Sequence, residues 1–65
     1  MQNTEVAAML IPVSQRLNAW ADNAEMMLHR CVVADESRWQ NERDNYNRLA
    51  VSVDVAIREL MGSAT

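Results

Sequence analysis

Apolar residues recur along this chain at alternating steps of three and four positions. That spacing is typical of an α-helix with one apolar seam, because it returns to the same face every two turns. The rhythm pauses at a polar stretch over residues 34–37 and then resumes. The seam positions are Val6, Leu10, Val13, Leu17, Trp20, Ala24, Met27 and Cys31, then Trp39, Glu42, Tyr46, Leu49, Val53, Ala56 and Leu60. We therefore predict an all-α fold, an antiparallel two-helix hairpin that resembles a coiled coil.

The pattern predicts one helical-hairpin domain over residues 1–65. The first helix is expected at about 4–32, the turn at about 33–36 and the second helix at about 37–61. Ser37 stands three residues before a glutamine, which is the capping-box pattern of a helix start.

The helix ends and one internal proline carry further signals. Asn3 and Thr4 are both good N-cap residues for the first helix. Pro12 either kinks a continuous helix or separates a short arm from the main helix, and the unbroken rhythm favours the kink. Gly62 is a natural residue just beyond a helix end, and residues 63–65 are expected to fray.

Folding the seam back on itself predicts which residues hold the hairpin together. Trp20 is expected to face Leu49, Leu17 to face Val53, and Ala24 to face Tyr46, with a register shifted by one layer as the alternative. Leu17, Trp20, Leu49 and Val53 should hold the fold together. Glu42 is the odd seam member, because a buried carboxylate is costly without a partner. It either reaches solvent or pairs with a nearby arginine: Arg30, Arg38 or Arg43.

The size of the chain indicates that it associates. A 65-residue chain buries only about 60% of its unfolded surface, so it needs a disulfide, a metal or a partner. Its single cysteine cannot form an internal disulfide. We therefore expect a homodimer, most simply a four-helix bundle of two hairpins, with a second protein as a further partner.

Apolar residues outside the seam suggest where association takes place. A two-helix hairpin cannot cover them, and uncovered apolar surface on a small chain usually marks an interaction site. Trp39 is the expected anchor because it lies near the turn among arginines. The predicted protein interface consists of Met26, Val51, Val55, Ile57, Met61, Trp39 and Arg43.

The chain carries no pattern of a catalytic, cofactor or metal site. His29 and Cys31 are two positions apart and point to nearly opposite sides of a helix. Asp22, Glu25 and His29 share an outer face, which is most simply a solvated polar surface. The sequence has one glycine, no phosphate-binding loop and no nucleophile elbow, so we expect a non-enzymatic protein without cofactors or metals.

Two resemblances bear on function. The length and hairpin layout resemble those of plasmid copy-number proteins that bind RNA. Nucleic-acid binding is not expected here, because the net charge is −3 and Arg16 and Arg30 are the only permanent cations of the first helix. The aromatic-led second half, Trp39 to Leu60, is similar to small co-chaperones of type III secretion, which implies an obligatory protein partner.

The expected function is thus a protein-interaction module that self-associates and acts as a regulator or adaptor. The alternative is a partner-dependent co-chaperone of a helical subunit, or a small inhibitor, phage-encoded in one version, that docks on a larger protein. No apolar stretch approaches the ~20 residues that span a bilayer, and the start of the chain lacks a signal-peptide pattern. A single cysteine fits a reducing compartment, so we expect a cytoplasmic protein.

Overall fold

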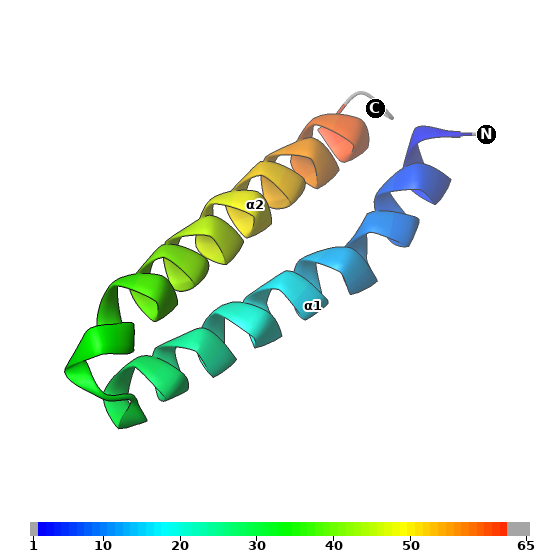
Figure 1. Cartoon of the computed structure of the whole chain (residues 1–65). Coiled ribbons are helices and arrows are strands. Elements are labelled where there is room, and N and C mark those ends of the chain that lie inside the picture. Colours follow the sequence, from blue (N-terminus) through cyan, green and yellow to red (C-terminus); the bar gives the residue numbers. More distant parts are fainter. Residues whose placement is uncertain (1, 63–65) are drawn as a thin grey trace.

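Two long helices lie antiparallel and side by side, joined by a tight turn (Figure 1). The structure is a computed structural model that describes residues 2–62. Helix α1 is Asn3–Arg30, a short 3₁₀ helix η1 is Val33–Asp35, and helix α2 is Glu36–Gly62. The hairpin is a rod of 49 × 14 × 14 Å. The predicted all-α fold of two packed helices is confirmed.

Helix α1 begins one residue earlier than expected. Gln2 has extended backbone angles, and its carbonyl accepts hydrogen bonds from the amides of Glu5 and Val6, both at 3.1 Å. Asn3 and Thr4, the predicted caps, therefore lie inside the first turn. The Glu5 carboxylate also lies in that turn, where it complements the positive end of the helix dipole.

Helix α1 continues through Pro12. Proline cannot donate to the carbonyl four residues earlier, which belongs to Ala8. Pro12 and Ala8 are both exposed, so water can satisfy that carbonyl. The structure therefore has the continuous helix rather than the separate arm.

The first helix stops at Arg30, two residues before the predicted end. Cys31 turns to an extended conformation, and its amide donates to the carbonyl of Met27 at 2.8 Å. Cys31 therefore caps the helix at the end of the seam and is half-buried rather than fully buried. Its thiol lies 3.4 Å from the carbonyl of Leu28.

The second helix is entered through η1 rather than through a capping box. The amide of Asp35 donates to the carbonyl of Val32 at 2.9 Å, which closes the 3₁₀ turn. Helix α2 then begins at Glu36, so Ser37 lies within it and not at its cap. At the other end, α2 includes Gly62, which has no positive φ and does not act as the predicted cap. Residues 63–65, where fraying was predicted, lie outside the described residues.

The helices touch along a row of small side chains, which corrects the predicted seam. Ala7, Ser14 and Ala21 recur every seven residues on α1 and are buried, whereas the next residue before each of them is not. Small side chains allow two helix backbones to approach closely and leave no room for large ones between them. Among residues 2–62 the buried set is Ala7, Ser14, Leu17, Ala21, Ala24 and Ala50.

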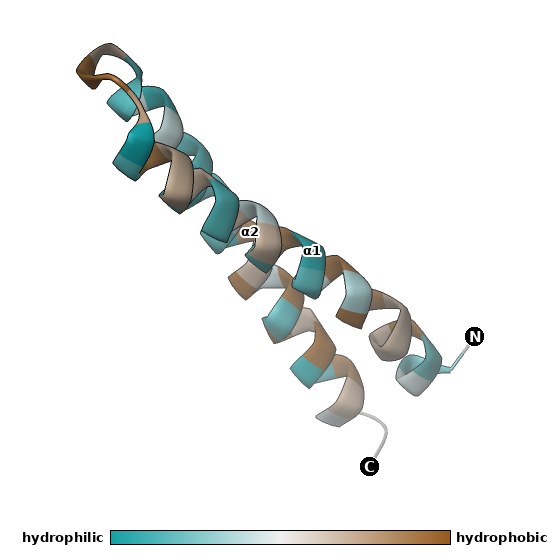
Figure 2. Cartoon of the chain, turned by 90° about the horizontal axis from the view of Figure 1, so that it is seen from below, coloured by the Kyte–Doolittle hydropathy of each residue, from teal (hydrophilic) through white to brown (hydrophobic). Residues whose placement is uncertain are grey.

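Two of the four predicted core residues therefore lie outside the core. Leu17 is buried and Val53 is half-buried, as expected. Trp20 remains 51% exposed and Leu49 52% exposed, because Ala21 and Ala50 occupy the interhelical positions beside them. Figure 2 shows apolar positions spread along both helices and at the turn.

The register of the hairpin lies within one layer of the predicted pairing. The rings of Trp20 and Tyr46 lie 5.7 Å apart between centroids, tilted by 49°. Trp20 was expected to face Leu49, and Tyr46 to face Ala24. Tyr46 lies about one layer before Leu49 on α2, whereas the contacts of Ser14 with Asp54 and of Glu25 with Arg43 fall only about one to two residues from the predicted pairing. The register is therefore the predicted one, shifted by at most one layer.

Candidate functional site

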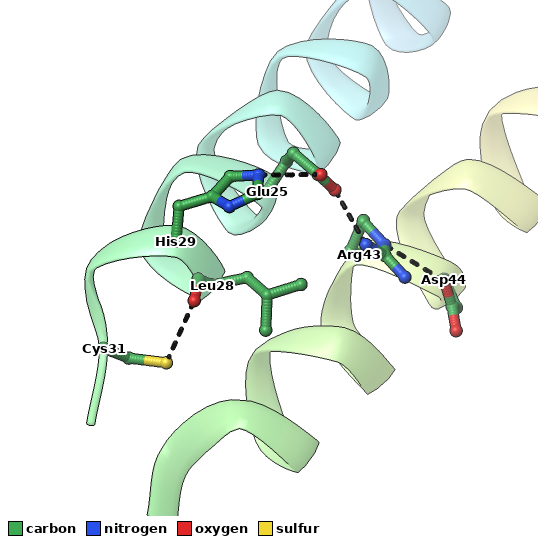
Figure 3. A network of polar contacts seen from close by, with 6 residues as sticks. All are labelled: Glu25, Leu28, His29, Cys31, Arg43 and Asp44. Atoms are coloured by element: carbon green, nitrogen blue, oxygen red, sulfur yellow. Dashed lines mark hydrogen bonds and ion pairs between the residues drawn. The ribbon is translucent and has the colours of Figure 1, made fainter. Parts of the chain in front are cut away.

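The hairpin has two unlike long faces, and the first of them is polar. Glu25 of α1 and Arg43 of α2 form an ion pair across the helices, with 2.9 Å between Oε2 and Nη1 (Figure 3). The other carboxylate oxygen of Glu25 lies 3.2 Å from Nε2 of His29, and Nε of Arg43 donates to Asp44 at 3.2 Å. Four side chains from both helices thus form one continuous polar network.

The charges of this network shift each other's protonation. The hydrogen bond from Arg43 is the main cause that lowers the pKa of Glu25 below its usual value of 4.5, and His29 adds to the effect. The same bond, followed by that to Asp44, raises the pKa of Arg43. Both groups are therefore held in their charged forms.

A second polar contact crosses the helices on the same face. The hydroxyl of Ser14 donates to Oδ1 of Asp54 at 2.5 Å, and Ser14 is itself buried. Asn18 donates to the carbonyl of Ser14 at 2.9 Å. Two polar contacts, Ser14 with Asp54 and Glu25 with Arg43, therefore join the helices on this face.

The predicted outer cluster of Asp22, Glu25 and His29 does not come together as a metal-binding group. Glu25 is held by Arg43 and His29, and over residues 2–62 no three His, Cys, Asp or Glu side chains gather where they could hold a metal ion. No pocket forms in this part of the chain either.

The opposite face is apolar and is here called the apolar face. Its members stand one position before the rows that line the helix contact, which are Ala7, Ser14, Ala21 and half-buried Leu28 on α1, and Ala50 and half-buried Ile57 on α2. In an antiparallel hairpin such residues project on the same side of both helices. Val13, Trp20 and Leu49 are its most open members, exposed by 42%, 51% and 52%. The apolar face consists of Val6, Val13, Trp20, Met27, Leu49 and Ala56.

Aromatic packing joins the two helices on this side. The contact between Trp20 and Tyr46 spans the hairpin, and Trp20 remains about half exposed. Trp20 is thus held in place by Tyr46 while still offering surface. A large, positioned aromatic side chain of this kind is a common anchor of protein interfaces.

Charged residues mark the turn end of the apolar face. Glu42 is 38% exposed and lies 3.9 Å from Nε of Arg38, one helical turn earlier. Both alternatives for Glu42 therefore apply, since it reaches solvent and also pairs with an arginine. The guanidinium of Arg38 lies 5.1 Å from the ring centre of Trp39, a weak cation–π contact.

The residues predicted as the association surface are spread around the rod. Met26, Val51, Val55 and Met61 are exposed, whereas Ile57 and Trp39 are half-buried. Met26 and Val55 are each five residues beyond a buried alanine, Ala21 and Ala50, so both lie away from the helix contact. Arg43 is engaged with Glu25.

The apolar face was not predicted from the sequence, because its members were assigned to the core. A signal was available in Ala7, Ser14 and Ala21, which repeat every seven residues and provide a seam of small side chains. With that row placed between the helices, Val13 and Trp20 necessarily fall outside it.

No known protein family, curated protein or solved structure shows significant similarity to this chain. Neither helix, as far as residues 2–62 extend, is long and apolar enough to cross a membrane.

Proposed function

We propose that this chain is a non-enzymatic protein–protein interaction module that self-associates and acts as a regulator or adaptor. The observation that carries the proposal is the half-exposed apolar face, with Trp20 held open at its centre. A contiguous apolar patch of this kind on a small protein usually marks an interaction surface.

The thin core of the hairpin supports the proposal. Alanine and serine make up most of the buried set, and such side chains contribute little apolar area. Full burial of a leucine or another large apolar side chain contributes about 1.5–3 kcal/mol, and the hairpin leaves much of this unused at Trp20 and Leu49. Covering the apolar face would supply the missing stability.

The polar face indicates on which side of the hairpin a partner binds. Its contacts, Glu25 with Arg43 and Ser14 with Asp54, are matched within the hairpin. A partner bound there would have to compete with them, whereas a partner on the apolar face would not.

A second candidate is binding to a different protein, as a co-chaperone or an inhibitor. It is favoured by Val32 and Val33 at the turn, which are 67% and 81% exposed. These residues lie at the tip of the rod and not on the apolar face. A larger partner that encloses the turn would cover both the two exposed valines and the apolar face.

Sedimentation equilibrium over a wide concentration range, with circular dichroism on the same samples, tests the proposal. We expect a helical dimer. A monomer with weak helicity at every concentration would contradict self-association and would make the second candidate the leading one.

A further inference from the structure

We infer that the apolar face is occupied by a second copy of this chain, related by a two-fold axis that places the two turns at opposite ends of the bundle. The inference rests on the proposed self-association and specifies its surface and geometry. An axis of this kind crosses the helices at mid-length, and each helix packs antiparallel on its own copy.

The apolar residues of α1 are symmetric about the middle of that helix. Helix α1 is Asn3–Arg30, so its midpoint falls between residues 16 and 17. Val13 and Trp20 are equally far from this midpoint, and so are Val6 and Met27. Across the axis, Val13 would therefore meet Trp20 of the other copy, and Val6 would meet Met27, which places a larger side chain opposite a smaller one in every layer.

The midpoint of helix α2 lies at nearly the same level of the rod as the midpoint of α1. Its range, Glu36–Gly62, has Leu49 at its midpoint, so Leu49 would meet its own copy at the axis. Glu42 and Ala56 are equally far from it, and the small alanine leaves the carboxylate room to reach solvent. The contacts between α1 and α2 put the midpoint of α1 within about 4 Å of Leu49 along the rod, at 1.5 Å per residue.

The alternative two-fold arrangement, with both turns at the same end, fits less well. It would stack α1 on α2 of the other copy and place Met27 against the Glu42 carboxylate. Desolvating a carboxylate against an apolar side chain is unfavourable.

Charges at the rim of the apolar face point the same way. With turns at the same end, Arg38 would lie beside Arg30 of the other copy. With turns at opposite ends it lies beside Glu59, an opposite charge, twice in each dimer. Arg16 then approaches its own copy at the axis, where both side chains are exposed and can extend into water.

The dimensions suit a stable dimer. The whole hairpin measures 49 Å by 14 Å between Cα atoms, and the apolar face spans about 32 Å of that length at 1.5 Å per residue. A second hairpin laid along the full length of the rod would cover an outline that approaches the ~800 Å² per partner of a standard protein interface. A second hairpin would also complete a four-helix bundle, in which each helix buries a wide apolar stripe.

The single cysteine provides a direct distance measurement on the unmutated chain. Cys31 lies at the turn and takes a nitroxide label, so pulsed electron paramagnetic resonance reports the distance between the two turns. We expect a distance on the order of the 49 Å rod length. A distance within about 20 Å, as for neighbouring helices, would overturn the opposite-end arrangement. Cys31→Ala with Val33→Cys moves the label to a more exposed turn position and should give the same result.

One variant on the apolar face and one off it test the surface itself. Trp20→Ser should raise the dissociation constant of the dimer at least about tenfold, since a central aromatic anchor is lost. Val55→Ser is the control, because Val55 has similar exposure to Val13 but lies off the apolar face; it should change the constant less than about threefold.

The outcomes test the apolar face as the interface separately from self-association itself. A dimer that tolerates Trp20→Ser but is broken by Val55→Ser would overturn the apolar face as the interface and leave self-association standing. A chain that stays monomeric at every concentration would overturn both. If Trp20→Ser unfolds the protein, the label distance on the unmutated chain still decides the arrangement.

Discussion

Two polar contacts join the helices of this hairpin, and each is made by one residue of α1 and one residue of α2. Ser14 with Asp54 and Glu25 with Arg43 lie on the same face at different levels of the rod. Since a slip of one helix past the other would break both, they favour one register over its neighbours. Polar groups at otherwise apolar helix contacts often have this role.

The Ser14 hydroxyl should contribute measurably to stability. We expect Ser14→Ala to lower the free energy of unfolding by about 1–2 kcal/mol, because a charged acceptor loses its donor in a partly buried position. Ser52→Ala is the control: Ser52 bonds only the carbonyl of Arg48 on its own exposed helix surface, so its loss should cost under about 0.5 kcal/mol. Equal effects of the two variants in urea unfolding would contradict the account.

The Glu25 carboxylate should make stability depend on pH. Its pKa is lower in the folded chain than in the unfolded one because Arg43 stabilises the charged form. The pair therefore contributes fully above the unfolded pKa, near 4.5, and its contribution is lost as the pH falls through the lower folded value.

We expect Glu25→Gln to lower the melting temperature at pH 7 and to reduce the further loss as the pH falls from about 5 through the lowered pKa of Glu25. Asp22→Asn removes the same charge one turn earlier on α1 and should leave the acid loss close to that of the unmutated chain. Melting curves over this pH range would speak against the ion pair if both variants retained the same acid loss.

At the scale of the helices, most of the architecture could be predicted and the packing rows could not. The step of three and four positions and the polar break at 34–37 were sufficient for two helices and a turn. They did not distinguish the row of Val13 and Trp20 from the neighbouring row of Ser14 and Ala21, because both repeat every seven residues. Ranking by hydrophobicity selects the first row, whereas close approach of two backbones selects the second.

The helix ends show a similar limit. Ser37 matches a capping box, yet η1 already turns the chain into α2 before it. At this helix start, the backbone geometry of the short 3₁₀ turn decided where α2 begins, and the capping-box pattern did not.

The small-residue contact has a direct mutational test. Ala50→Leu should destabilise the hairpin by about 1–3 kcal/mol, because added methylene groups have no room between the helices. Ala19→Leu makes the same change at an exposed position of α1 and should have little effect on chemical unfolding. A stabilising Ala50→Leu would mean that Leu49, and not Ala50, occupies the helix contact.

At the scale of the whole molecule, the hairpin is a rod with one face that carries polar contacts between its helices and one face that exposes apolar side chains. The polar face holds its ion pairs internally, and the apolar face leaves Trp20 and Leu49 half exposed around mid-length. We propose that such a rod forms one half of a four-helix bundle. Folding and association are then expected to be linked, as in many obligate dimers.

Thermal unfolding at different protein concentrations tests this link most directly. Circular dichroism melts over an approximately hundredfold concentration range should show a melting temperature that rises with concentration, because association stabilises only the folded form. A fully helical chain whose melting temperature stays constant over that range would be stable as a single hairpin. That result would contradict the central claim that the apolar face is covered by a partner copy.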